Sequence, residues 1–284
     1  MARESRSPHT GANTRGRRGE NPSPVSARQR RRTYAQNFLA DTATARRVVR
    51  AGGVGAGDEV VEVGEVGAGD GMLTRFLAPA CGSLTAYEID PHLAARLRSR
   101  FGPAVRVVRA DFREAPAPPR PFHVVGNIPY SATAGIVRWC LEAPRLVSAT
   151  LVTQLEYARK RTGGFGRWSR LAVRTWPQFD WRMAGRVPRE RFTPVPRVDS
   201  AILRLVHRDR PLVPDTELAA YRALVDLGFS GVGGSLRASL RRGHAGRRVD
   251  AALAAAGVGR TEVVARVSPD QWIMLHVRLN GHSR

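Results

Sequence analysis

Lysine, cysteine and long apolar runs are scarce in this chain of 284 residues. The two cysteines, Cys81 and Cys140, lie in different apolar segments, which favours reduced thiols in a cytoplasmic protein over a disulfide framework. No apolar run approaches the length of a membrane span, and the first residues lack the apolar region of a signal peptide. The seven histidines show no metal-ligand spacing, so no metal is expected.

Positive charge is abundant and is carried almost entirely by arginine. The formal net charge is +22, the pI is about 11.6, and Lys160 is the single lysine. Guanidinium groups bind phosphate through paired hydrogen bonds and stack on bases. The composition therefore predicts a protein that acts on nucleic acid. The alternative is a solubility or coding bias, which does not explain the large excess over acids.

The chain divides into three parts by composition. Residues 1–32 contain nine arginines and two acids with almost nothing apolar, which predicts a disordered basic arm, either lying along phosphates or without a role. Residues 33–209 alternate between strand and helix patterns. Residues 210–284 read as short amphipathic helices with recurring arginines, which predicts a small helical domain that faces the nucleic acid.

A strand followed by a glycine-rich turn begins at Glu59. The run Gly67-x-Gly69-x-Gly71 opens a helix and allows the backbone to approach a ligand closely. Glu88 ends the next predicted strand, at the distance where a carboxylate accepts from both hydroxyls of a ribose. The pattern predicts a nucleoside-cofactor site over a plain turn. The spacing between the glycine-rich turn and Glu88 favours Gly67 over Gly64 as the first glycine that contacts the ligand.

The same stretch contains a tandem duplication. Glu62-Val63-Gly64 is repeated as Glu65-Val66-Gly67. One copy must extend the strand or bulge from it, and the sequence leaves both possibilities open.

Two further strands end in polar side chains. Asp111 follows a predicted strand and can accept from an adenine amine, with Phe112 flanking the ring; a helix-cap role is the alternative. The run 122–126 leads into Asn127-Ile128-Pro129-Tyr130. The Asn127 oxygen and the Ile128 carbonyl can accept from an exocyclic amine, and Tyr130 can stack on the base. A turn without chemistry is the alternative.

Aromatic and basic residues follow in the second half of the chain. The segments 156–161 and 163–170 are basic with interleaved aromatic residues, and they predict an RNA-facing element. Phe192 begins a Pro-rich loop and either clamps the second face of a flipped base or anchors the loop in the core.

Together these motifs resemble the rRNA adenine N6-methyltransferases over roughly residues 30–280. The matching motifs occur in the family's order: Gln36-Asn37-Phe38-Leu39, Glu65-x-Gly67-x-Gly69-x-Gly71, Glu88-Ile89-Asp90, Ala110-Asp111-Phe112, Asn127-Ile128-Pro129-Tyr130 and Phe192-x-Pro194-x-Pro196-x-Val198. Residues 154–161 and the Trp168 loop look like the erythromycin-resistance (Erm) branch. Two departures are the duplication and the run 229–236, which replaces a more basic run of many relatives.

The resemblance implies a Rossmann-like α/β domain with a seven-stranded mixed sheet and a small C-terminal helical domain. It also implies transfer of methyl from S-adenosylmethionine to N6 of one adenine in 23S rRNA, before or during ribosome assembly, by a monomer. That methylation gives macrolide, lincosamide and streptogramin B resistance. The implied catalytic residues are Asn127, Tyr130 and Phe192, with the last two sandwiching the base. The implied cofactor residues are Gln36, Asn37 and Leu39 (methionine), Gly67 and Gly69 (turn), Glu88 (ribose), Ile89, Asp111 and Phe112 (adenine), and Asn127.

Two other functions remain open from the sequence. One is a small-subunit 16S rRNA adenine dimethyltransferase with the same motifs, against which the 157–168 segment argues. The other is a non-catalytic nucleic-acid-binding protein on the same fold, which would have no need of Gly67, Glu88, Asp111 and Asn127.

Overall fold

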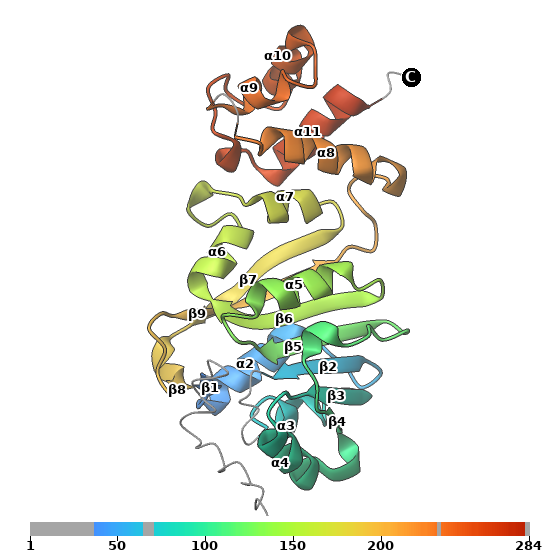
Figure 1. Cartoon of the computed structure of the whole chain (residues 1–284), viewed down its shortest axis with the longest axis vertical. Coiled ribbons are helices and arrows are strands. Elements are labelled where there is room, and N and C mark those ends of the chain that lie inside the picture. The colour runs from blue at the N-terminus through green and yellow to red at the C-terminus, as the bar shows by residue number, and fades with distance from the viewer. Residues whose placement is uncertain (1–36, 65–70, 232–233, 282–284) are drawn as a thin grey trace, which may run out of the picture.

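The structure, a computed structural model, describes residues 37–64, 71–231 and 234–281. Figure 1 shows a central sheet with helices on both faces and a group of C-terminal helices stacked beyond one edge of it. The expected mixed sheet of seven strands with a helical C-terminal region is confirmed.

The seven-stranded sheet has the order β4-β3-β2-β5-β6-β9-β7. Neighbouring strands from β4 to β6 pair in parallel, whereas β9 is antiparallel to both β6 and β7. All carboxyl ends of the parallel strands therefore meet at one edge. The strands are β2 (Glu59–Gly64), β3 (Ser83–Tyr87), β4 (Arg106–Val108), β5 (Phe122–Asn127), β6 (Leu146–Gln154), β7 (Phe179–Val187) and β9 (Ser200–His207).

Both faces of the sheet are buried, which explains the Val-rich strands. Consecutive side chains alternate between two cores: Val124 belongs to one core and Val125 to the other, and both are fully buried. Helix α5 (Thr133–Glu142) covers the first face through Ile136, and α2 (Thr42–Gly52) covers the second through Val48.

Helix ends follow local capping signals. The Asp41 carboxylate accepts from the Thr44 N–H at 2.9 Å and begins α2, which ends at Gly53 with φ +62°. Asp90 caps α4 (Pro91–Phe101) in the same way, with Pro91 at its first position. The remaining helices of this part are α3 (Thr74–Leu77), α6 (Leu155–Arg161) and α7 (Arg170–Thr175).

A two-stranded sheet joins distant parts of the chain. β1 (Phe38–Leu39) pairs antiparallel with β8 (Phe192–Thr193), so that Leu39 lies opposite Phe192. The sequence did not predict this pairing. It places the segment after residue 36 beside the 192–199 loop.

The C-terminal helices have a core of their own. Trp272 and Tyr221 are fully buried there, together with Leu236. The helices are α8 (Leu218–Gly228), α9 (Leu236–Leu240), α10 (Gly246–Ala255) and α11 (Pro269–Asn280).

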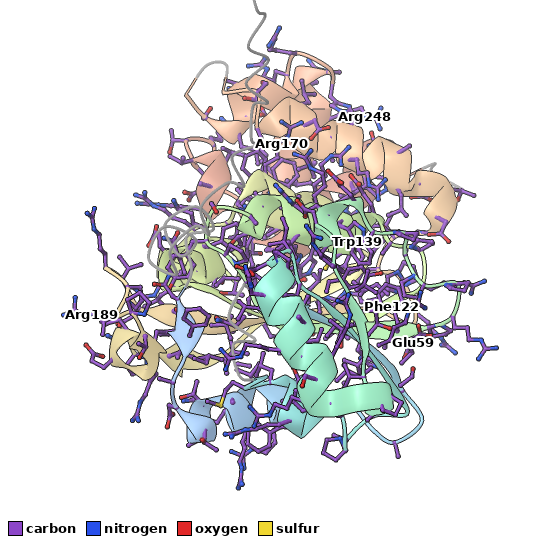
Figure 2. The ribbon with its side chains drawn as sticks, turned by 60° about the horizontal axis from the view of Figure 1, so that its bottom comes forward. Glu59, Phe122, Trp139, Arg170, Arg189 and Arg248 are labelled. Atoms are coloured by element: carbon purple, nitrogen blue, oxygen red, sulfur yellow. The ribbon has the colours of Figure 1, made fainter. Side chains whose placement is uncertain are left out.

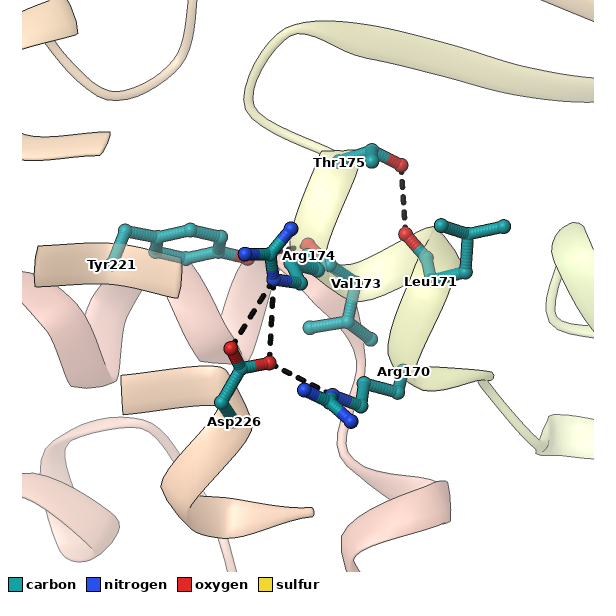
Figure 3. A network of polar contacts seen from close by, with 7 residues as sticks. All are labelled: Arg170, Leu171, Val173, Arg174, Thr175, Tyr221 and Asp226. Atoms are coloured by element: carbon teal, nitrogen blue, oxygen red, sulfur yellow. Dashed lines mark hydrogen bonds and ion pairs between the residues drawn. The ribbon is translucent and has the colours of Figure 1, made fainter. Parts of the chain in front are cut away.

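A polar network connects these helices to the sheet domain (Figure 3). Asp226 of α8 accepts from Arg170 Nε at 2.8 Å and from Arg174 Nε at 3.3 Å, and both arginines belong to α7. The Tyr221 hydroxyl donates to the Val173 carbonyl at 2.9 Å. α7 is therefore the element to which the C-terminal helices attach.

Candidate active site

The candidate site lies where the parallel strands end. Gly64 at the end of β2 is paired with Asn127 at the end of β5. Glu88 and Asp111 follow β3 and β4 at the same edge. Doubly wound sheets bind ligands at this edge, so the topology brings together the polar residues that the motifs single out.

Asn127 has a fixed side-chain orientation. Its amide Nδ2 donates to the Asn37 backbone carbonyl at 2.9 Å, and the side chain is buried, with 7 % exposure. Because Nδ2 is the donor, Oδ1 is the acceptor end of the amide. This is the end that an exocyclic amine requires. Asn37 contributes to the site through its backbone, a role that its side chain did not suggest.

Tyr130 lies in the turn after β5 and is half-buried. Its hydroxyl is 2.7 Å from Ser200 Oγ at the start of β9. The Pro129 carbonyl accepts from the Ala132 N–H at 3.0 Å and from the Thr133 hydroxyl at 3.1 Å, which closes the turn. The position of the ring is thus fixed by the turn at its backbone and by Ser200 at its hydroxyl. The sequence did not predict the contact with Ser200.

Glu88 is a buried carboxylate with one oxygen unpaired. Its Oε1 accepts from the Asp90 N–H at 2.8 Å, whereas Oε2 has no hydrogen-bond partner among the described residues. Burial raises the pKa of Glu88 to about 8. The next residue, Ile89, is an exposed apolar side chain, at 38 %. A donor pair such as a ribose diol would satisfy the carboxylate, and a flat ring would cover Ile89.

Asp111 acts as a cap, as the alternative interpretation had it. It accepts from the Arg113 N–H at 2.9 Å and pairs with the Arg113 side chain at 2.5 Å. Hydrogen bonding to Arg113 holds the pKa of Asp111 below its ordinary value. A ligand amine would have to share this carboxylate with Arg113.

Three apolar candidates lie in the core rather than on the open surface of the site. Phe112 is 4 % exposed, and its ring packs on the rings of Tyr87 and Trp139 at centroid distances of 5.6 and 4.3 Å. Leu39 and Phe192, paired across β1 and β8, are 4 % and 1 % exposed. For Phe192 this matches the loop-anchor interpretation, because a buried ring must move before it can stack on a base.

The remaining candidates, Gln36, Gly67 and Gly69, lie outside the described residues. The first copy of the duplication forms β2 up to Gly64. Its Glu62 is buried, and burial raises its pKa to about 7. Gly71 has φ +68°, and a Cβ there would lie 2.4 Å from the Phe101 ring, so this turn position requires glycine.

Within the described ranges, no group of three His, Cys, Asp or Glu side chains is arranged to hold a metal ion. No helix in those ranges is long and apolar enough to cross a membrane.

The fold and the site define a class: an α/β methyltransferase fold with its candidate ligand site at the carboxyl edge of the sheet. The chain matches the family model described as ribosomal RNA adenine dimethylase over residues 27–280, and it belongs to that family. It is therefore an S-adenosylmethionine-dependent rRNA (adenine-N6-)-methyltransferase.

Individual relatives agree with this assignment. The chain is 55 % identical over 256 residues to an rRNA adenine N-6-methyltransferase of Streptomyces fradiae, covering 86 % of this chain and 76 % of the relative. It is 35 % identical to the mycinamicin-resistance protein MyrB of Micromonospora griseorubida, covering 87 % and 78 %. The crystal structure of 23S rRNA methyltransferase ErmE superposes with a TM-score of 0.82 at 51 % identity, covering 86 % of this chain and all of that one.

Proposed function

We propose that this chain methylates N6 of one adenine in 23S rRNA and thereby confers resistance to macrolides, lincosamides and streptogramin B. The observation that carries the proposal is the Asn127 amide, buried and oriented by Asn37 at the same edge of the sheet as the Glu88 carboxylate. The choice of 23S over 16S rRNA is supported by the likeness to the structure titled 23S rRNA methyltransferase ErmE. The mycinamicin-resistance relative supports the resistance phenotype.

The residues at the strand ends fit S-adenosylmethionine. Glu88 offers the ribose hydroxyls a buried oxygen that no described residue contacts by a hydrogen bond, and Ile89 offers an exposed apolar surface to the adenine. Asp111 would accept from the adenine amine, in competition with Arg113. We assign the methionine end to Asn37 and Asn127, the two residues that a hydrogen bond already joins.

When bound, S-adenosylmethionine supplies a methyl group on a sulfonium, which departs as a neutral thioether once a nucleophile attacks. The Asn127 Oδ1 would accept from an N6–H of the target adenine, turning the nitrogen lone pair out of conjugation and toward the methyl carbon. Tyr130 would hold the flipped base by stacking. The proton that N6 loses after the attack would pass to solvent. Positioning by the protein provides most of the acceleration.

We also propose that a single copy of the chain acts in the cytoplasm, on 23S rRNA before or during ribosome assembly. Flipping a base out costs the least free energy where the RNA is single-stranded and not yet packed against ribosomal proteins.

The test is transfer of a radiolabelled methyl group to protein-free 23S rRNA and, separately, to 16S rRNA, with primer-extension mapping of the product. We expect label in 23S rRNA alone, with one stop in the peptidyl-transferase loop. Label in 16S rRNA alone would reject the 23S assignment, and RNA binding without transfer to either would reject the catalytic one.

A further inference from the structure

Two depressions border helix α6, and they share residues. The first lies between α6 and the 186–199 segment and is lined in part by Gln154, Glu156, Arg159, Arg197 and Val198. The second is lined by Glu156, Arg159, Lys160, Gly164, Arg167 and Arg266. Because Glu156 and Arg159 line both, the two depressions adjoin each other along α6, and together they are called here the α6 groove.

One end of this groove adjoins the site for the target base. The Leu155 N–H donates to the Asp199 carbonyl at 2.9 Å, which ties the start of α6 to the loop before β9. The next residue, Ser200, is the partner of the Tyr130 hydroxyl. A strand whose base stacks on Tyr130 would therefore enter the groove directly.

The other end reaches the C-terminal part of the chain. The Trp168 N–H donates to the Ala265 carbonyl at 2.7 Å. This bond places Arg167 of the α6–α7 loop and Arg266, far apart in the sequence, on the same depression. The groove thus runs from the catalytic edge of the sheet to the C-terminal helices.

The charges of the groove suit a phosphate backbone. In the first depression, carboxylates already engage two arginines: Asp199 accepts from Arg186 Nε at 2.8 Å and from the Arg189 N–H at 3.0 Å, and Glu190 pairs with Arg189 at 3.0 Å. Arg197 is exposed and belongs to no ion pair described for residues 37–64, 71–231 and 234–281.

The second depression is the more basic of the two. Arg159, Lys160, Arg167 and Arg266 face a single carboxylate, Glu156. That carboxylate pairs with Lys160 at 3.5 Å, and both side chains are more than 60 % exposed, so the pair is weak. Toward the catalytic end of the groove, Val198 offers an exposed apolar side chain, at 46 %.

We propose that the α6 groove binds the single-stranded RNA segment that continues from the target adenine. The nucleotide next to the adenine would lie against Val198 with its phosphate on Arg197, and later phosphates would reach Arg167 and Arg266. A basic groove that follows the backbone, with a stacking residue at one end, is the usual arrangement for binding a single strand. This inference rests on the proposed function and adds a path and an order of contacts to it.

The first test compares Arg197→Ala and Arg266→Ala with Arg120→Ala. Arg120 is an exposed loop arginine just before β5, at the amino edge of the sheet. In Figure 2, Glu59 and Phe122 at that edge lie on the opposite side of the view from Arg189. The RNA is the 23S fragment that the wild-type protein methylates. The logarithm of the RNA association constant falls linearly with the logarithm of the salt concentration. We expect each groove variant to make this slope shallower by about 0.7, the value for one phosphate of a single strand. Arg120→Ala should leave the slope unchanged. S-adenosylmethionine affinity should not change.

The second test orders the contacts by phosphate-ethylation interference. Arg197→Ala should abolish interference at a phosphate adjacent to the target adenine, and Arg266→Ala at a phosphate farther along the same strand. The proposal is overturned if the order is reversed, if the two sites fall on different strands, or if the salt slopes match that of Arg120→Ala. If the wild-type protein methylates 23S rRNA and any of these results is found, the RNA path is refuted and the proposed function stands. If the wild-type protein does not methylate 23S rRNA, the proposed function itself is refuted.

Discussion

The Asn127 side chain donates to the Asn37 carbonyl at 2.9 Å and joins two segments that are 90 residues apart. β1 starts one residue after Asn37 and pairs with β8, so the bond also links the end of β5 to the 192–199 loop. The orientation of the proposed catalytic amide therefore depends on a contact between distant parts of the chain.

Asn127→Asp tests this orientation, because a carboxylate has the same shape but cannot donate to the Asn37 carbonyl. We expect kcat to fall by about 100-fold or more, as for loss of one preorganised hydrogen-bonding group. S-adenosylmethionine affinity should change by less than about tenfold. Asn280→Ala is the control, since that amide also donates to a backbone carbonyl, Ala220 at 3.4 Å, but in the C-terminal helices. Near-normal turnover of Asn127→Asp in single-turnover assays would refute its assigned role.

Glu88 should make cofactor binding depend on pH. Burial raises its pKa to about 8, and hydrogen bonds donated by ribose hydroxyls would favour the charged form and lower that pKa. Binding then releases a proton below about pH 8, so affinity should rise with pH, by at most about tenfold per unit, and level off above about pH 8. Calorimetry over this range measures the slope and the proton release.

Two variants separate Glu88 from its neighbour. Glu88→Gln should bind more weakly and lose the slope. Glu62→Gln should keep the slope with a lower midpoint, because the Glu62 charge contributes to raising the pKa of Glu88. A slope that persists in Glu88→Gln would contradict the ribose assignment.

Tyr130 has two features that substitutions can separate. Tyr130→Phe removes the hydroxyl that contacts Ser200 at 2.7 Å and should lower kcat/KM for RNA by less than about tenfold. Tyr130→Ala also loses the ring, which at about 1–3 kcal/mol per stacked base predicts a loss of roughly 5- to 150-fold. Ser200→Ala should match Tyr130→Phe, and the double variant should be no worse than either. Equal losses for Phe and Ala would exclude stacking.

Much of the fold was predictable because its signals are local. Within the part expected to alternate between strand and helix patterns lie α4 (Pro91–Phe101), α5 (Thr133–Glu142) and β9 (Ser200–His207), whose apolar periods are visible in the sequence. β1 and β8 were missed. Each is two residues long, too short to show a period, and their pairing joins residues more than 150 positions apart.

The site was predictable in its polar residues and less so in its aromatic ones. Strand-end positions placed Glu88, Asp111 and Asn127 at one edge, because parallel strands all end there. An aromatic residue in a loop carries no such signal. Phe112 was expected to flank the adenine ring, and Phe192 either to clamp a base or to anchor its loop. Packing places both rings in the core.

The joint between α7 and α8 should matter for RNA binding as well as stability. Hydrogen bonds from Arg170 and the nearby Arg174 charge outweigh the effect of burial and hold the pKa of Asp226 below its ordinary value. The interaction of Asp226 with the two arginines therefore stabilises the fold above about pH 4. This contribution is lost as the pH falls through the pKa of Asp226 in the folded state. Asp226→Asn should cost about 1 kcal/mol or less, since the carboxylate is partly exposed, and should lower Tm by a few degrees.

Asp250→Asn is the matched control for this joint. Asp250 pairs with Arg237 at 2.6 Å within the C-terminal helices, at an exposure similar to that of Asp226. Both variants should lower Tm in calorimetry, but only Asp226→Asn should raise KM for RNA. An equal rise in both would mean that the joint does not set the position of the C-terminal helices.

The duplicated tripeptide allows a direct test of the cofactor turn. Removing residues 62–64 or residues 65–67 gives the same sequence, so one deletion leaves a single Glu-Val-Gly that can keep the register of β2 with β5. The link from β2 to Gly71, which its φ of +68° and the Phe101 ring hold in place, then shortens by three residues. A shorter link costs less loop-closure entropy, by about 0.6 kcal/mol for each halving of its length, so we expect the deletion to tighten S-adenosylmethionine binding by about threefold. Weaker binding in the same titration would show that the longer link between β2 and Gly71 suits the cofactor better than the shorter one.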